Sequence, residues 1–142
     1  MPEAEATFTI KAPLDRVWSF LVDPRRLGSC FPDVQEVRVL DEKTAEWVLK
    51  VKLGFIRKTI KMKSTVTDFV PQKRVTFQGV AEEAELSGTM NLESGPGEVK
   101  IHYKILMEGR GPLAPLMNDL IRRRISKQSQ EFIEILQKKL EV

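Results

Sequence analysis

Residues 8–34 read FTIKAPLDRVWSFLVDPRRLGSCFPDV, and this stretch decides the fold. Apolar and polar residues alternate in it up to Ala12-Pro13, a pattern typical of a strand with one buried face. Pro13 suits the first turn of a helix, because proline has a fixed φ and no amide hydrogen. The apolar residues between 17 and 21 then share one helical face. The stretch therefore predicts a strand followed directly by a helix.

A second short helix is predicted to begin at Asp23-Pro24. Asp23 is a typical N-cap, since its carboxylate can accept a hydrogen bond from an amide of the first turn, and Pro24 suits the first helical position. Leu27 anchors this helix, and Gly28 is placed to end it. Pro32-Asp33 turns the chain toward the next strand. The order strand, helix, helix and turn is thus set before residue 35.

Six further strands are predicted, each with apolar residues at alternate positions. Short turns join them, so neighbouring strands should pair mostly antiparallel, because a parallel crossover needs a dozen or more residues. Beyond a glycine-rich hinge at 109–112, apolar residues recur at helical spacing from Leu113 to Leu140. This apolar stripe drifts around the helix, which predicts a bend. The expected strands span residues 35–41, 44–53, 56–70, 74–82, 85–93 and 99–107.

Length and composition indicate the class of protein. The 142 residues predict one domain, residues 1–142, and the 42% apolar and 30% charged residues are ordinary for a soluble globular chain. The single cysteine, Cys30, excludes an intrachain disulfide and fits a reducing cytosol. No apolar run approaches the roughly 20 residues that cross a bilayer. We therefore expect a cytoplasmic protein, with peripheral contact to a membrane left open. The net charge of +3 is too small to indicate a nucleic-acid partner.

Several short motifs occur in a characteristic order. They are Phe8-x-Ile10-x-Ala12-Pro13, Val17-Trp18-x-Phe20-Leu21-x-Asp23, Leu27-x-x-Cys30-x-Pro32, Val51-Lys52-Leu53-Gly54-Phe55-Ile56, Leu86-Ser87-Gly88 and Gly109-x-Gly111-Pro112-Leu113-Ala114. Together they resemble the carbon-monoxide-dehydrogenase G-subunit family of the START-like superfamily (SRPBCC, polyketide cyclase and lipid transport). The chain departs from the family pattern at Phe31, where leucine is expected, and at Asp33, where glycine is usual.

The resemblance implies an α+β helix-grip fold, in which a sheet of about seven antiparallel strands wraps around the long C-terminal helix. Such folds enclose a cavity, and most members bind lipids, quinones, polyketides or other apolar molecules there. The resemblance thus implies non-enzymatic binding of a small apolar ligand. It also implies an accessory role beside a molybdenum-containing enzyme of the carbon-monoxide-dehydrogenase type.

Side-chain phase predicts which residues line the cavity. Alternation in the strands and the apolar stripe of the last helix select Trp47, Leu49, Ile60, Met62, Ser64, Phe77, Met90, Tyr103, Met117, Leu120, Arg124, Gln128 and Phe132. The turn at Gly54, the region of Asp33 and the hinge at Gly109 are the candidates for a gate.

Four of these lining residues are polar. Burying Ser64, Tyr103 or Gln128 without a partner costs about 1–3 kcal/mol, so each needs a protein group, a water molecule or a ligand. Arg124 has two interpretations. It is either a cation that holds an acidic or carbonyl head group, or an arginine whose stem packs while its guanidinium reaches water or an acid.

Catalytic and metal-binding patterns are weak. His102 is out of phase with Ile101 and Tyr103, so it should face away from the cavity. Cysteine and histidine do not occur at zinc-ligand spacing, and the Gly-x-Gly sequences lack the context of a phosphate loop, so we expect no metal and no cofactor. Cys30 is interpreted as a small buried hydrophobe rather than a reactive thiol.

Two other functions stay open. One is a cyclase or hydratase that uses the same cavity, with Tyr103 or Asp68 as its acid or base. The other is an accessory protein that docks on a redox enzyme or a membrane through basic strands. Those strands carry Lys50, Lys52, Arg57, Lys61 and Lys63, which could contact anionic lipid heads or simply form a solvated face.

Overall fold

The computed structural model describes residues 2–53 and 55–141; the predicted turn at Gly54 lies outside them. One seven-stranded sheet has the order β1-β7-β6-β5-β4-β3-β2, and every neighbouring pair is antiparallel. The strands are β1 (Glu3–Ile10), β2 (Val34–Val39), β3 (Thr44–Leu53), β4 (Ile56–Val70), β5 (Arg74–Val80), β6 (Ala84–Gly95) and β7 (Glu98–Gly109). The first two strands of the chain therefore form the two edges of the sheet. This confirms the predicted fold class.

The two short helices lie where the sequence predicts them. Helix α1 spans Leu14–Leu21 with Pro13 at its N-cap, and α2 spans Pro24–Gly28. Asp23 caps α2, since its Oδ1 accepts hydrogen bonds from the amides of Arg25 at 3.0 Å and Arg26 at 3.4 Å.

Gly28 ends α2 as predicted, but for a different reason. The residue after it, Ser29, has a φ of −66°, so the end has no left-handed residue. A Cβ atom at Gly28 would lie 2.7 Å from Val37 Cγ2 and 3.1 Å from the indole ring of Trp47. A glycine therefore stands there because α2 packs closely on β2 and β3.

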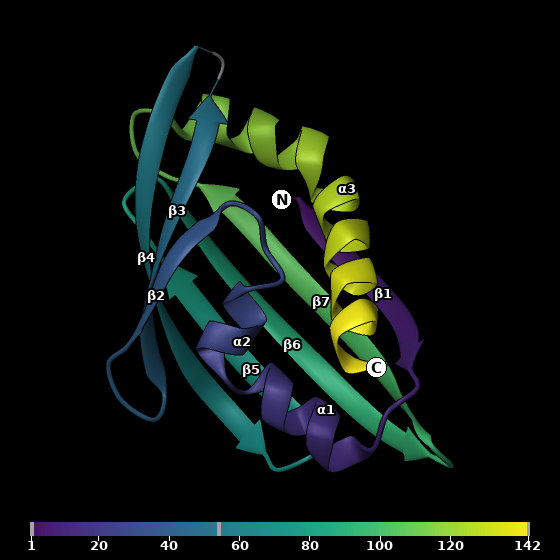
Figure 1. The fold of residues 1–142 in the computed structure, drawn as a ribbon. Coiled ribbons are helices and arrows are strands. Elements are labelled where there is room, and N and C mark those ends of the chain that lie inside the picture. The colour runs from purple at the N-terminus through teal and green to yellow at the C-terminus, as the bar shows by residue number, and fades with distance from the viewer. Residues whose placement is uncertain (1, 54, 142) are drawn as a thin grey trace.

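The long helix α3 spans Ala114–Leu140 and crosses the concave face of the sheet. Figure 1 shows that it changes direction about halfway along, as the drift of its apolar stripe predicts. Helices α1 and α2 cover the same face of the sheet (Figure 1). In the described part of the chain, no helix has the length and apolar character needed to span a bilayer.

Buried side chains form two clusters between the sheet and its helices. The lower cluster contains residues of α1, β1, β5, β6, β7 and the second half of α3, among them Ile10, Val17, Met90, Ile101, Tyr103, Phe132 and Leu136. The upper cluster contains Ile60, Ala81, Ala84 and Met117, with Leu49, Val51, Met62, Leu113, Leu120 and Ile121 packed against it. The two halves of α3 thus pack on different parts of the sheet.

The sequence predicts that inward-facing and outward-facing side chains alternate along the whole of β4. This prediction is wrong beyond the middle of the strand. The register with β5 shifts between Val66 and Asp68, which marks a β-bulge. Past this bulge Phe69 turns toward α1, where its ring centroid lies 5.4 Å from that of Trp18. Asp68 is exposed and binds Arg74 at 2.7 Å. The extra residue therefore reverses which side chains face the helices.

Candidate ligand-binding site

The predicted lining residues fall into three groups along the concave side. Met90, Tyr103, Phe132 and Phe77 belong to or pack on the lower cluster, whereas Ile60, Met117, Leu49, Met62 and Leu120 belong to or pack on the upper one. Trp47, Ser64, Arg124 and Gln128 belong to neither. Ser64 lies on β4 between Met62, which packs on the upper cluster, and Val66, which packs on the lower one. Arg124 and Gln128 lie on α3 between Ile121 of the upper side and Phe132 of the lower cluster. We call Trp47, Ser64, Arg124 and Gln128 the middle group.

Ser64 finds its partner within the protein. Its Oγ accepts a hydrogen bond of 2.8 Å from Trp47 Nε1 on the neighbouring strand β3, and it lies 3.4 Å from the carbonyl oxygen of Ala45. The indole and the hydroxyl satisfy each other, so neither group of this pair requires a ligand.

Gln128 and Arg124 also have a protein partner. Gln128 Nε2 donates a hydrogen bond of 3.0 Å to Asp33 Oδ2, and Arg124 Nη1 lies 3.6 Å from the same oxygen. The second interpretation of Arg124 is therefore the one seen: its guanidinium pairs with an acid, and 42% of its side chain stays exposed. Asp33 is one of the positions at which the family resemblance leads one to expect another residue, here glycine.

Tyr103 is the exception among the polar residues. Its hydroxyl is buried and has no hydrogen-bond partner among residues 2–53 and 55–141, and the residue as a whole is 2% exposed. Burial raises the pKa of this phenol above its ordinary value of 10.0. The group therefore stays neutral near pH 7 and is available to donate a hydrogen bond. A buried hydroxyl without a partner is costly, which makes Tyr103 the best candidate for contact with an occupant of the interior.

Aromatic rings surround Tyr103. The rings of Phe8 and Phe132 each lie 6.0 Å from it, centroid to centroid, and both are edge-on. Phe132 in turn stacks face to face on Phe31, at 4.9 Å and an interplanar angle of 2°. Sequence reasoning identified Phe31 only as a departure from the family pattern, because no local pattern shows that it meets α3.

Several apolar side chains on the helix-covered side are only half-buried. These side chains lie on the same face of the sheet as Tyr103, as strand phase and register show, yet solvent reaches part of each. They are Phe77, Leu86, Ile105 and Met107. A fully packed interior would cover them. Solvent therefore reaches part of the apolar sheet face on the side of α3.

The structure also has an open depression of about 810 Å³, which lies elsewhere. It surrounds the β4–β5 turn and contains none of the predicted lining residues. Among its strand residues, Thr7 and Asn91 are both register partners of His102, and all three have the opposite phase to Phe8, Met90 and Tyr103. The depression therefore belongs mainly to the outer face of the sheet, and polar and apolar side chains line it together.

The remaining candidates for chemistry lie away from the interior. His102 points outward as predicted, and its Nε2 lies 2.7 Å from Glu5 Oε2. Asp68, which the cyclase hypothesis needs as an inward acid, is exposed on β4. Cys30 is fully buried, and this burial raises the pKa of its thiol. Within residues 2–53 and 55–141, His, Cys, Asp and Glu side chains form no group of three that could hold a metal ion.

Gly109 does not have the surroundings of a hinge. It ends β7 and is buried, and its amide donates a hydrogen bond of 2.7 Å to Asn118 Oδ1. A Cβ atom there would lie 2.7 Å from the carbonyl oxygen of Ala114. The left-handed residue of the link is Gly111, with a φ of 73°. Gly109 therefore fixes the start of α3 against the sheet.

Solved structures resemble this chain over nearly its whole length. A conserved protein from Geobacillus kaustophilus is 17% identical, with a TM-score of 0.79 over 98% of this chain and 95% of that one. A START superfamily protein from Mycobacterium smegmatis is 10% identical, with a TM-score of 0.74 over 98% and 97%. The Zhui aromatase/cyclase from a Streptomyces species is 16% identical, with a TM-score of 0.64 over 99% and 93%. These likenesses establish a START-like fold.

Sequence comparison identifies the family. Curated protein sequences give no significant match to the chain. The family profile of CoxG, the G-subunit of carbon monoxide dehydrogenase, matches residues 7–141, which is nearly the whole chain. The helix-grip arrangement of one antiparallel sheet and a long C-terminal helix agrees with this match. The chain belongs to the CoxG family, the carbon monoxide dehydrogenase G-subunit family.

Proposed function

We propose that this protein binds a small apolar ligand between the concave face of the sheet and α3, and that it does so without catalysis. The observation that carries the proposal is the buried hydroxyl of Tyr103, which has no partner among the described residues. A carbonyl or ether oxygen of the ligand would accept its hydrogen bond. Lipids, quinones and polyketide-like molecules combine such an oxygen with a large apolar body.

Burial of apolar surface would supply most of the affinity. Transfer from water stabilises a bound molecule by roughly 25 cal/mol for each Å² of apolar surface removed. The half-buried side chains of Phe77, Leu86, Ile105 and Met107 would gain contacts as the ligand is covered. One hydrogen bond to Tyr103 would then orient the ligand rather than bind it tightly, as placed polar groups do in apolar pockets.

Non-catalytic binding fits the chemistry of Tyr103 better than a cyclase does. An acid or base works best when its pKa lies near the working pH. The pKa of Tyr103 is raised instead, and Asp68 lies outside the interior. Tyr103 therefore acts as a neutral donor in this proposal.

Native mass spectrometry of the purified protein tests the proposal. A small apolar molecule should travel with the 16.2 kDa chain and be released by organic solvent. Independently, the uncharged dye N-phenyl-1-naphthylamine should brighten on binding, and the Tyr103→Phe variant should bind the recovered ligand more weakly, by roughly three- to tenfold. Recovery of no ligand, together with no dye binding, would overturn the proposal.

The family membership supports a role beside a redox enzyme. The family description names carbon monoxide dehydrogenase. We propose that this protein is an accessory of an enzyme of the carbon-monoxide-dehydrogenase type, one that contains molybdenum. An apolar carrier would serve such an enzyme by holding a poorly soluble molecule. Co-purification of the two proteins from cells that contain both would test this role, and separate elution at low salt would count against it.

A second candidate function, contact with an anionic membrane surface, is favoured by the end of the β3–β4 hairpin. Phe55 is fully exposed there, and Ile56 beside it is 49% exposed. Lys52 and Arg57 are register partners immediately behind this apolar tip. An exposed aromatic residue with cations behind it matches the chemistry of a lipid interface.

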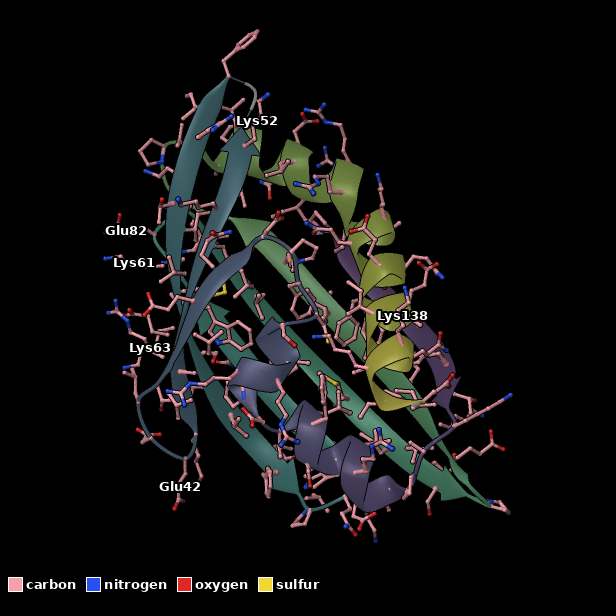
Figure 2. The ribbon with its side chains drawn as sticks, viewed as in Figure 1. Glu42, Lys52, Lys61, Lys63, Glu82 and Lys138 are labelled. Carbon is pink, nitrogen blue, oxygen red and sulfur yellow. The ribbon has the colours of Figure 1, made fainter. Side chains whose placement is uncertain are left out.

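The basic side of the same hairpin continues along β4. Lys61 and Lys63 project outward from the sheet, away from the helices (Figure 2). Each basic residue near an anionic membrane contributes about 1 kcal/mol. Sedimentation with vesicles that contain anionic lipid should therefore be salt-sensitive and should weaken in Phe55→Ser and Lys52→Glu variants. Equal binding to vesicles of neutral lipid would contradict this function.

A further inference from the structure

Three residues at successive turns of α3 hold the segment from Phe31 to Asp33. Arg124, Gln128 and Phe132 are each four positions apart, so their side chains lie on one face of the helix. Gln128 and Arg124 contact the Asp33 carboxylate at 3.0 and 3.6 Å. Phe132 stacks on Phe31 at 4.9 Å. These contacts attach the turn after α2 to the middle of the long helix.

Asp33 also forms a hydrogen bond with the sheet. Its backbone carbonyl accepts a hydrogen bond of 3.0 Å from the amide of Lys50, which belongs to β3. One residue therefore contacts β3 through its backbone and α3 through its side chain. Since β3 is next to the edge strand β2, Asp33 links that side of the sheet to the helix that covers the concave face.

The contacts lie next to the proposed ligand site. Phe132 packs edge-on against Tyr103, so only one ring separates Phe31 from the unpartnered hydroxyl. On α3, Arg124 and Gln128 lie between Ile121, which packs on the upper cluster, and Phe132 of the lower one. The contacts between the Phe31–Asp33 segment and α3 therefore lie where the upper cluster ends and the lower cluster begins.

The polar contacts of the Asp33 carboxylate with α3 are accessible to water. The Asp33 side chain is 26% exposed and that of Arg124 is 42% exposed. Ion pairs with such access stabilise weakly, so they can break without unfolding the buried clusters. A contact of this strength suits an element that opens and closes.

We propose that Phe31, Pro32 and Asp33 form a closure over the ligand site, and that Arg124 and Gln128 hold it shut through the Asp33 carboxylate. This inference rests on the proposed ligand-binding function. Breaking the contacts of Asp33 with α3 opens a route between the α2–β2 turn and the helix. Arg124 then controls entry and exit rather than binding the head group of the ligand.

Stopped-flow binding of N-phenyl-1-naphthylamine tests the closure, because an uncharged dye does not respond directly to altered charges. Asp33→Asn and Asp33→Ala should raise both the association and the dissociation rate, by roughly five- to tenfold for Asp33→Ala. The dissociation constant should change less than threefold, since both rates rise. The charge reversal Arg124→Asp should act like Asp33→Ala, and adding Asp33→Arg to it should restore slow exchange.

Two matched controls separate the closure from general loosening. Glu36→Ala removes an acid close to Asp33 that binds Arg38, and Arg123→Met removes the neighbouring arginine, which binds Asp119. Both should keep wild-type rates. Unchanged rates in the Asp33 and Arg124 variants with intact dye binding would overturn the closure and leave the ligand site standing. Equal acceleration in the controls would also overturn it. Failure of the wild type to bind the dye would overturn ligand site and closure together.

Discussion

Phe31 lies flat on Phe132, with ring centroids 4.9 Å apart, and this stack joins the turn after α2 to α3. Stacked aromatic pairs contribute about 0.5–1.5 kcal/mol beyond the area they bury. Phe31→Leu, which restores the residue that the family resemblance leads one to expect, should therefore lower the free energy of unfolding by roughly 1 kcal/mol. Urea unfolding at equilibrium measures this change.

A matched control for that substitution is Phe69→Leu. Phe69 is also partly exposed and also packs on one aromatic ring, that of Trp18. It should cost a similar free energy but leave dye exchange unchanged, because Phe69 packs on Trp18 of α1 and takes no part in the contacts between the closure and α3. Faster exchange in both variants would mean that stability, and not the Phe31 stack, sets the rate.

The hydrogen bond between Trp47 and Ser64 predicts the cost of removing one partner. Ser64→Ala leaves the partly buried indole Nε1 without its acceptor. A fully buried donor without a partner costs about 1–3 kcal/mol, so the loss here should lie near the lower end of that range. Chemical denaturation should show this loss. Ser126→Ala on the exposed side of α3 should stay within about 0.5 kcal/mol of the wild type. A loss as large in Ser126→Ala would contradict the account.

Alkaline pH should destabilise the protein through two buried groups. Burial raises the pKa of the Cys30 thiol above 9.0 and that of the Tyr103 phenol above 10.0. In the unfolded chain both groups ionise near those ordinary values, so the unfolded state binds fewer protons there than the folded state. The stability that neutral burial provides is therefore complete below about pH 9 and falls as the pH rises above that value.

This pH dependence can be followed at a single residue, because Tyr103 is the one tyrosine of the chain. Tyrosinate absorbance near 295 nm should stay low above pH 10 while the protein is folded and should rise on unfolding. Tyr103→Phe should flatten the decline of stability above pH 10. Normal tyrosinate formation at pH 10 in the folded protein would show that the phenol is exposed.

Close packing at Gly28 predicts a local steric effect. The Cβ atom of Gly28→Ala would lie 2.7 Å from Val37 Cγ2, so α2 or β2 must shift, at a cost of about 1–3 kcal/mol. Gly95→Ala is the control, since its nearest neighbour is the flexible Glu98 side chain at 3.5 Å. Thermal unfolding should separate the two variants, and an unchanged melting temperature in Gly28→Ala would contradict this packing.

Local patterns in the sequence were sufficient to predict much of the fold. Asp23-Pro24 marks the start of α2 because capping and proline geometry depend on adjacent residues. Alternation correctly placed Tyr103 toward the helices and His102 away from them, since side-chain phase in a regular strand is also local. The bulge in β4 could not be predicted in this way. The register shift that places Asp68 outside arises from pairing with β5.

Contacts between distant parts of the chain account for what sequence analysis missed. The need for a partner at Ser64, Tyr103 and Gln128 follows from their polarity, but the identity of the partner follows from folding. Trp47 and Asp33 satisfy two of them, whereas the buried Tyr103 hydroxyl has no partner in the part of the chain that the structure describes. No periodicity could show that Phe31 and Phe132 meet, because the two residues belong to opposite ends of the chain.

The most direct test of the central claim is a high-resolution crystal structure of the protein purified without detergent or organic solvent. The account predicts elongated density between the concave face of the sheet and α3, with one polar atom within hydrogen-bond distance of Tyr103 Oη. A water molecule or a protein group bonded to Oη, in an interior otherwise filled by side chains, would contradict it.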